Sequence, residues 1–380
     1  MKTNSRIVII TRNLFLDFLP PIISKLYFRF RNRNANPPID KSTLSLMSGL
    51  IPSELEAQVD SFINSQDYLK TSRYWRHLIL RHLRVMSSKG VENWGNSVAF
   101  NYFTWTRLDD TKLQSLTHHN LEDSNFLKIH KGLTPAESYS YNVITNLLWE
   151  HLRKSSHISL KQLESFSNRF SAGNAPTVVI GGMPVTQDLL NSAIEYESFS
   201  TALPSIGGSI LEIGAGSGRN ADFMLSLGTV TKYMIIDIPP ASFIAMERLT
   251  KNHPSLRIYA CKNSQELEDY LKSEEWDVLF ILPSFASVLP TKYFDLTLAI
   301  DCLHEMTKIM RLTYSGIAKD KSRNFYVKVW KKAFIPVDRE FLDATNFDQY
   351  GFDPNWNCLR SATCVFPSDF HEHLFKFNET

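Results

Sequence analysis

The residues Ser209-Ile210-Leu211-Glu212-Ile213-Gly214-Ala215-Gly216-Ser217-Gly218 form the most informative stretch of this 380-residue chain. An apolar strand runs directly into a turn with glycine at every second position, and a helix is expected to begin near Arg219. Glycine allows the turn to be tight and lets a ligand approach the backbone where a Cβ would obstruct it. The stretch therefore predicts a strand–turn–helix corner that binds a nucleoside.

The next expected strand carries an acid that fits this prediction. It spans 233–237 and ends on Asp237, 25 residues after Glu212, where a carboxylate can bind the hydroxyl groups of a ribose. A dinucleotide site would need its third glycine at position 219, which is Arg219, and Glu212 would repel a pyrophosphate. The same acid suits a cationic ligand, so S-adenosylmethionine is favoured over NAD as the cofactor. The expected cofactor contacts are Glu212, Gly214, Gly216, Gly218, Asp237 and Ile238.

The hydropathy pattern from 209 onward predicts an α/β fold. Strands are expected at 209–213, 233–237, 277–282, 294–301 and 323–330. Helices are expected between them at 218–227, 240–252, 264–273 and 304–318. Strands separated by helices indicate a parallel, Rossmann-like sheet with right-handed crossovers. The segments 357–365 and 370–377 are expected to add an antiparallel pair.

The first 174 residues have a different pattern, which divides the chain into three parts. Residues 1–38 are expected to form a basic amphipathic arm and linker, 39–174 a largely helical domain, and 175–380 the cofactor-binding domain. Thr134 and Glu137 form a capping box at the start of one predicted helix, and Thr186 is the expected N-cap of another.

The composition indicates a globular protein and excludes some partners. Hydrophobic residues make up 43% and charged residues 21% of the chain, and the formal net charge of +2 gives no reason to expect nucleic acid binding. The four cysteines contain no CxxC pair and are expected to be free thiols in a cytoplasmic protein. The sequence shows no apolar run long enough to span a bilayer and no secretory signal pattern.

The arm at 1–33 has two interpretations. It holds seven Lys or Arg residues against one acid, Asp17, interleaved with large apolar and aromatic residues. Such a segment can lie on the inner surface of the cytoplasmic membrane with its basic groups toward anionic lipids. Alternatively, its apolar residues pack against the helical domain.

The glycine pattern and several further segments resemble a known family. Glu-x-Gly-x-Gly-x-Gly with a downstream acid is typical of class I S-adenosylmethionine-dependent methyltransferases. Over about 175–332, the chain resembles bacterial sugar O-methyltransferases in the segments 176–192, 210–219, 236–240, 280–283, 294–296, 303–306 and 326–330. The resemblance implies methylation of a hydroxyl group on a sugar or glycan precursor, in polysaccharide biosynthesis. A natural-product O-methyltransferase and a non-catalytic S-adenosylmethionine-binding protein are the alternatives.

The chain departs from the family pattern at the third strand. Many class I enzymes have an acid or amide near the end of this strand, where it binds the adenine amino group. Here the strand ends in Pro283-Ser284-Phe285, and Asp277 lies at the opposite end of the strand. Ser284 and nearby backbone amides are therefore the expected substitutes.

The residues after the fourth strand are the catalytic candidates. The segment 301–306 contains Asp301, His304 and Glu305, at the edge of the sheet where ligands bind. A histidine with a pKa near neutrality can remove the proton of an acceptor hydroxyl, and Asp301 can orient its ring. Two other interpretations stay open: His304 caps or packs the following helix, or the three residues bind Mg²⁺.

Overall fold

The computed structural model describes most of the chain from 128 onward and scattered residues before it. It covers 128–377 except 156, 171–174, 204–205, 207, 336–339 and 365–368. Between 58 and 93 it covers 58–62, 65, 67, 71–72, 75, 78–79, 82, 86, 90 and 93. The predicted arm at 1–33 lies outside the described residues, as do the two predicted domain boundaries at 38 and 174.

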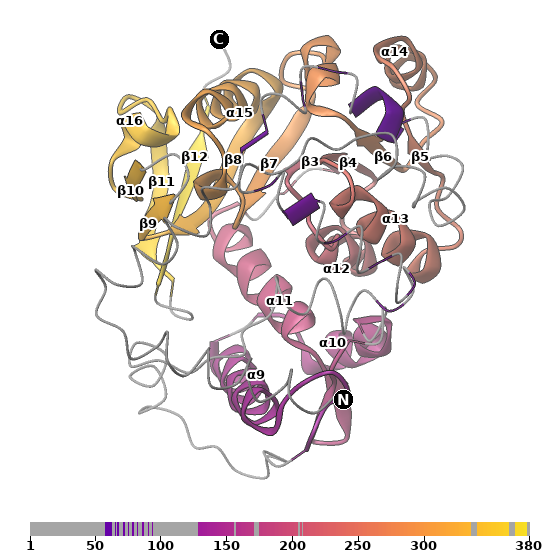
Figure 1. The fold of residues 1–380 in the computed structure, drawn as a ribbon, viewed down its shortest axis with the longest axis vertical. Coiled ribbons are helices and arrows are strands. Elements are labelled where there is room, and N and C mark those ends of the chain that lie inside the picture. The colour runs from indigo at the N-terminus through magenta and orange to yellow at the C-terminus, as the bar shows by residue number, and fades with distance from the viewer. Residues whose placement is uncertain are drawn as a thin grey trace, which may run out of the picture.

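An eight-stranded sheet forms the centre of the described structure (Figure 1). In spatial order its strands are β11 (Asn357–Thr363), β12 (Phe370–Lys376), β8 (Ser322–Trp330), β7 (Phe294–Ile300), β3 (Ser209–Ile213), β4 (Lys232–Ile236), β6 (Val278–Ile281) and β5 (Ile258–Ala260). The six strands from β8 to β5 are parallel, and β12 runs antiparallel to both β8 and β11. The predicted α/β fold with a final antiparallel pair is confirmed.

The direction of the chain through this sheet creates a crevice. From β3 the chain proceeds to β4, then to β5 at the edge of the sheet and back to β6 between them, and afterwards it crosses to β7 on the other side of β3. Helices that follow strands on the two sides of such a reversal lie on opposite faces of the sheet. Ligands bind in these folds at the carboxyl ends of the strands beside the reversal. The reversal between β3 and β7 therefore marks the place for a site.

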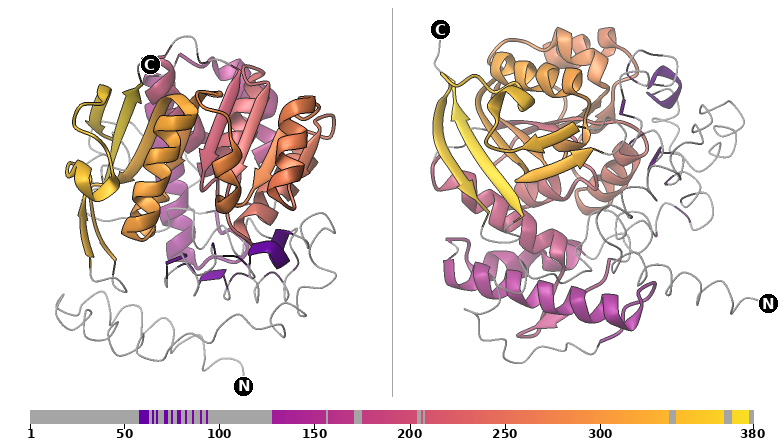
Figure 2. Two further views of the ribbon diagram at one scale, coloured as in Figure 1. Left: turned by 90° about the horizontal axis from the view of Figure 1, so that it is seen from above. Right: turned by 60° about the vertical axis from the view of Figure 1, so that its left-hand side comes forward.

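Helices cover both faces of the sheet (Figure 2). On one face α12 (Arg219–Leu227) packs against α11 (Gln187–Ser200) and α13 (Ala241–Asn252), and α15 (Lys308–Lys321) lies on the other face against β8. The helix α14 (Ser264–Ser273) follows β5, and α16 (Phe347–Tyr350) packs against α15. The central strands are buried on both sides, and every residue of β6 is buried.

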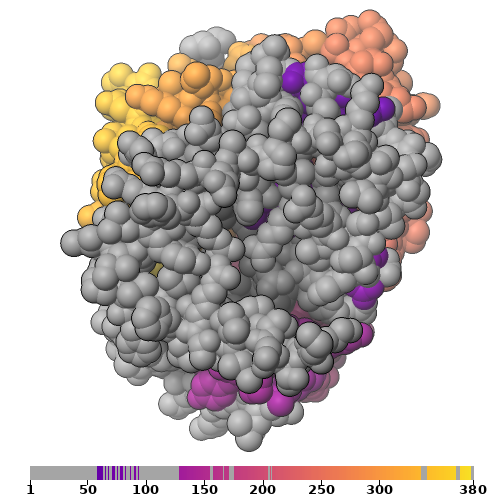
Figure 3. All heavy atoms as spheres, in the orientation of Figure 1, coloured from indigo at the N-terminus to yellow at the C-terminus, as the bar shows by residue number. Residues whose placement is uncertain are grey.

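Two further helices precede the sheet. They are α9 (Pro135–Ser155) and α10 (Leu160–Ser167), and α9 packs against α11. The predicted capping box is present, because the Glu137 backbone amide donates to the Thr134 hydroxyl (3.2 Å) and the Thr134 amide donates to the Glu137 carboxylate (2.9 Å). Thr186 caps α11 as predicted, accepting a hydrogen bond from the Leu189 amide. In Figure 3, the α9 region reaches the surface at the bottom of the molecule and the C-terminal strands at the upper left.

The sequence prediction missed the shortest elements and misplaced one helix start. The hairpins β1 (Val178–Ile180) with β2 (Met183–Val185) and β9 (Lys332–Ile335) with β10 (Glu340–Asp343), like β5, have strands too short for a clear hydropathy pattern. The helix predicted at 304–318 is instead a 3₁₀ turn, η4 (Leu303–Glu305), followed by α15. The reason is Thr307, whose hydroxyl accepts a hydrogen bond from the Met310 amide and so starts the helix later.

Two simpler expectations can be compared with the structure. All four cysteines are free thiols, as predicted. Within the part of the chain that the structure describes, no helix combines the length and the apolar character needed to cross a bilayer.

Candidate functional site

A cavity of about 360 Å³ opens at the carboxyl ends of β3, β4, β6 and β7. Its volume is in the range of small-ligand sites. Four segments that follow these strands form its wall: the glycine turn 214–217, Asp237 with Ile238, Pro283, and 301–307. The cavity therefore lies at the reversal between β3 and β7, where the topology predicts it.

The three glycines of the turn have left-handed backbone angles and different neighbours. Their φ values are 69° at Gly214, 58° at Gly216 and 71° at Gly218. A Cβ at Gly214 would lie 2.7 Å from the Cβ of Cys302, and one at Gly218 would lie 2.9 Å from the Cβ of Ala245. Close packing against Cys302, which follows β7, and against α13 thus requires two of the glycines. Gly216 contributes to the cavity wall.

Asp237 connects the end of β4 to the glycine turn. One carboxylate oxygen accepts a hydrogen bond from the Gly216 amide (2.8 Å) and the other accepts one from the Ile238 amide (2.7 Å). Burial raises the pKa of this carboxyl to about 7, against the effect of the two amides. The acid expected to bind ribose therefore also fixes the conformation of the turn.

Glu212 lies on β3 at the base of the cavity. Its carboxylate accepts hydrogen bonds from the Tyr233 hydroxyl (2.8 Å) and the Asn220 side-chain amide (3.5 Å). Burial raises its pKa to about 7. A cation placed near Glu212 would favour the ionised carboxylate, because the surroundings otherwise disfavour its charge.

A buried ion-pair network lies beside the glycine turn, and sequence analysis did not find it. Glu195 of α11 accepts two hydrogen bonds from Arg219 (2.6 and 2.9 Å) and one from Lys328 of β8 (2.8 Å). Burial alone would raise the pKa of Glu195, but the two cations lower it to about 2. The sequence signal was the cation Arg219 next to the turn, which does not identify its partner.

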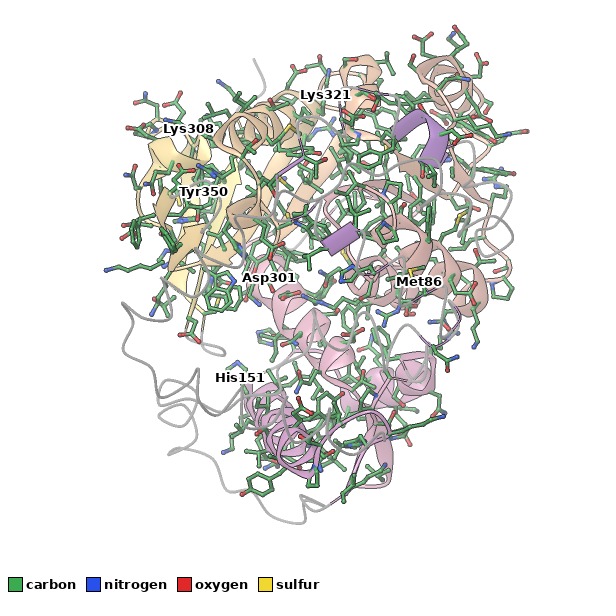
Figure 4. The ribbon with its side chains drawn as sticks, in the orientation of Figure 1. Met86, His151, Asp301, Lys308, Lys321 and Tyr350 are labelled. Atoms are coloured by element: carbon green, nitrogen blue, oxygen red, sulfur yellow. The ribbon has the colours of Figure 1, made fainter. Side chains whose placement is uncertain are left out.

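Asp301 follows β7 and lines the cavity (Figure 4). Its φ of 58° is unusual for a residue with a side chain, and its Oδ1 atom is buried with no hydrogen-bond partner in the described part of the chain. Burial raises its pKa to about 6, while Lys328 acts in the opposite direction. Asp301 thus lines the cavity and has one carboxyl oxygen that is buried without a partner among the described residues.

His304 differs from the prediction in two respects. The ring is buried and its Nδ1 atom has no hydrogen-bond partner among the described residues, so Asp301 does not orient it. Burial lowers its pKa to about 3 instead of leaving it near neutrality. His304 lies in the three-residue 3₁₀ turn η4, and a histidine buried in this way is a weak base.

Of the remaining predicted residues, Glu305 lines the cavity and Ser284 does not. Glu305 accepts a hydrogen bond from the Trp75 indole nitrogen (3.0 Å). The Ser284 side chain is exposed, and its backbone amide donates to the Asp67 carboxylate (3.0 Å). Asp67 and Trp75 line the cavity, although both come from a segment more than 200 positions earlier in the chain, which sequence analysis did not connect with the site.

Aromatic side chains form the wall beyond β7. The rings of Trp330 and Phe370 have centroids 5.0 Å apart, and the His304 ring is 6.1 Å from that of Trp330. All three line the cavity near Asp301. Within the described residues, no three His, Cys, Asp or Glu side chains are grouped so that they could hold a metal ion.

Comparisons with known proteins give distant likenesses. No protein-family model and no curated protein matches the chain. Among solved structures, a SAM-dependent methyltransferase from Aquifex aeolicus is similar over 49% of this chain and 93% of its own, at 14% identity and a TM-score of 0.31. The glycopeptide N-methyltransferase MtfA, complexed with sinefungin, is similar over 48% of this chain and 93% of its own (12% identity, TM-score 0.34). The pyocyanin biosynthetic protein PhzM is similar over 50% of this chain and 55% of its own (13% identity, TM-score 0.33). Likenesses this distant leave the function to be argued from the residues of the chain itself.

Proposed function

We propose that the protein is an S-adenosylmethionine-dependent O-methyltransferase that acts on a hydroxyl group of a sugar or glycan precursor. The observation that carries the proposal is the position of two buried carboxyl groups, Glu212 and Asp237, around Gly216 at the reversal point of the sheet. Such an arrangement suits a nucleoside with an attached cation and not a pyrophosphate.

The residues fit this cofactor. Asp237 holds the glycine turn with both oxygens, and each carboxylate oxygen can accept a further hydrogen bond from a ribose hydroxyl. Glu212 provides negative charge at the base of the cavity. Gly216 lines the cavity, where the lack of a side chain leaves the backbone accessible to a ligand. When bound there, S-adenosylmethionine would supply a methyl group on a positively charged sulfur.

Asp301 is the best candidate for the base. The acceptor hydroxyl must lose its proton as the methyl group is transferred, and Asp301 is a partly exposed carboxylate in the cavity wall that can accept it. His304, with its low pKa, instead contributes its ring to the wall. Glu305 is engaged by Trp75 and helps to fix the rim.

The wall near Asp301 favours a sugar as the acceptor. Trp330 is a partly exposed aromatic ring, packed on the buried Phe370, that can stack on the C–H face of a pyranose, and Asp301 can accept hydrogen bonds from the hydroxyl groups of the sugar. A phenolic natural product would use the rings but has less need of the carboxylates. The proposal further places the enzyme in the cytoplasm, with residues 1–33 at the inner membrane surface near a lipid-linked acceptor. It includes no nucleic acid partner.

The test combines binding and transfer. We expect calorimetry to show binding of S-adenosylmethionine but not of NAD, and labelled methyl groups to appear in a glycan extract. The variant Gly216→Ala should weaken cofactor binding by at least tenfold, because it adds a methyl group and backbone strain at a residue that lines the cavity. The matched control is Gly228→Ala: Gly228 has a similar φ of 71°, but space is free around it. Each variant should lose about 1–2 kcal/mol of stability from the backbone strain.

Three results would contradict the proposal in different ways. If the protein bound NAD and not S-adenosylmethionine, the assignment of the cofactor would be wrong. Binding without transfer to any acceptor would favour a non-catalytic binding protein. If methyl groups were transferred to phenolic compounds but not to glycans, the proposed O-methylation would stand and the proposed sugar acceptor would be wrong.

A further inference from the structure

We infer that Asp67, from the segment before the sheet domain, recognises the exocyclic amino group of the cofactor's adenine and thereby sets the base specificity of the site. The inference rests on the proposed function, because it requires a nucleoside cofactor. It assigns to a residue outside the sheet a contact that the end of the third strand lacks.

Only one of the two carboxylate oxygens of Asp67 accepts a hydrogen bond from the described residues. One of its oxygens accepts a hydrogen bond from the Ser284 backbone amide (3.0 Å), directly after β6. The other oxygen has no hydrogen-bond partner among the described residues, while the side chain lines the cavity. Only 4% of Asp67 is exposed. A carboxylate buried to this degree with a free oxygen is ready to accept a hydrogen bond from a ligand.

Several contacts fix Asp67 in this position. Its backbone carbonyl accepts hydrogen bonds from the amide and the hydroxyl of Thr71 (3.0 and 2.8 Å), and its amide donates to the Ser65 hydroxyl (3.1 Å). Earlier in the segment, the Gln58 side chain donates to the carbonyl oxygen of Phe280 in β6 (3.2 Å). The segment is thus attached to the same strand end at two points.

The order of the strand ends indicates which part of the cofactor Asp67 would meet. The cavity extends from Asp301 after β7, past the glycine turn after β3 and Asp237 after β4, to Pro283 after β6. If ribose lies at Asp237 and the acceptor lies near Asp301, the base lies on the far side of the ribose, toward β6. Asp67 is bound to the residue that follows Pro283, so it lies at the end of the cavity where the base is expected.

Hydrogen-bond chemistry makes this contact selective. A carboxylate only accepts hydrogen bonds, and the 6-amino group of adenine donates them. The hypoxanthine base of an inosyl nucleoside has a carbonyl oxygen at this position, which the carboxylate would repel. Asparagine behaves differently at position 67, because a single amide cannot accept from both the Ser284 amide and adenine. It can accept from Ser284 while donating to the hypoxanthine oxygen.

The experiment compares S-adenosylhomocysteine with S-inosylhomocysteine by calorimetry. Wild-type protein should prefer the adenosyl compound by about 10- to 100-fold, the value of one charge-assisted hydrogen bond. Asp67→Asn should remove or reverse this preference. The variant should bind the adenosyl compound more weakly and the inosyl compound more tightly than wild type does. If Asp67 had a purely structural role, the variant would bind both ligands more weakly and by the same factor.

A matched control separates this effect from general loss of a carboxylate. Asp295 accepts a hydrogen bond from the Ser209 amide (3.1 Å), as Asp67 does from Ser284, but at the opposite ends of the strands. Asp295→Asn should keep the wild-type preference. If the preference were unchanged in Asp67→Asn, the assignment of Asp67 would be wrong, but the proposed function would not be affected. If folded wild-type protein bound neither compound, the proposed function itself would be contradicted. If Asp67→Asn did not fold, Asp67→Ser would replace it, with loss of the preference again expected and its retention again overturning the assignment.

Discussion

Asp301 combines a left-handed backbone angle, an uncommitted oxygen and a raised pKa at one position. Each of these costs free energy in the folded protein, of the order of 1–3 kcal/mol for the backbone angle alone. Features of this kind concentrate at functional sites, where a ligand compensates for them. At the residue scale, Asp301 is therefore the position where stability and function are most directly opposed.

The pH dependence of turnover should identify the base. Asp301 accepts a proton only when ionised, so kcat at saturating cofactor should fall as the pH falls through about 6. Asp301→Asn should lower kcat by about 10²- to 10⁴-fold and leave cofactor affinity nearly unchanged. Measuring kcat against pH for wild type and variant checks both expectations.

The control for this prediction is His304→Ala. Its ring has a pKa of about 3, so its removal should not abolish a pH effect near 6. If the fall near pH 6 persisted in Asp301→Asn and disappeared in His304→Ala, the histidine would be the base and the assignment to Asp301 would be wrong.

Some site residues were predictable from the sequence and others were not. Gly214, Gly216, Glu212 and Asp237 belong to a local pattern, and the structure brings them together around one cavity, whereas Gly218 packs against α13. Asp67 and Glu195 reach the site region only through the tertiary fold, and no spacing along the chain relates them to it. The environment of His304 could not be predicted either, because burial, which lowers its pKa, is a property of the packed structure.

At the element scale, α11 is the helix that joins the glycine turn to β8. Its Glu195 holds Arg219, directly after the turn, and Lys328 near the carboxyl end of β8. All three side chains are largely buried, so each charge depends on the others for compensation. This helix therefore fixes the start of α12 relative to the sheet.

Glu195→Gln should be strongly destabilising. It leaves Lys328 and Arg219 buried without a counter-charge, a change that costs about 3–5 kcal/mol in comparable cases. Urea denaturation at pH 7 measures the loss. The control is Glu150→Gln, which breaks an exposed pair with Arg153 and should cost about 1 kcal/mol or less.

The pH dependence of stability has a definite sign for this group. The folded-state pKa of Glu195 is about 2, below its usual 4.5, so its stabilising contribution is complete above pH 4.5 and is lost as the pH falls toward 2. The difference in stability between wild type and Glu195→Gln should shrink over this interval. A difference that was constant from pH 5 to 2 would contradict the ion-pair explanation.

Most elements were predictable because their periodicity is strong. The strand at 209–213 and the helix at 264–273 have the predicted bounds, since buried strands and capped helices leave clear patterns. The 3₁₀ turn after β7 was predicted as part of an α-helix. Leu303 and its neighbours are compatible with either conformation, and only the cap at Thr307 shows that the α-helix begins later. The hairpins β1–β2 and β9–β10 are too short to give a pattern.

At the scale of the whole molecule, the proposed membrane contact of residues 1–33 can be tested by co-sedimentation. Full-length protein should bind anionic vesicles at low salt, because each basic residue near such a surface contributes about 1 kcal/mol. Added salt should weaken the binding, and deletion of residues 1–33 should abolish it. Neutral vesicles provide the control.

Two results would contradict this prediction. Full-length protein that stayed in solution at low salt would rule out the contact. A shortened protein that aggregated would show that the arm packs against the rest of the chain.

The attachment of Gln58, Asp67 and Trp75 to the ends of β6 and β7 has a consequence for the order of assembly. Their partners lie 217 to 230 positions later in the chain, so these contacts close the longest loops at the site, at a large entropic cost. During synthesis, Gln58, Asp67 and Trp75 leave the ribosome before the strands that they contact have been made. The nascent chain therefore acquires its glycine turn well before it acquires a closed cavity, and selective recognition of the ligand is among the last properties to appear.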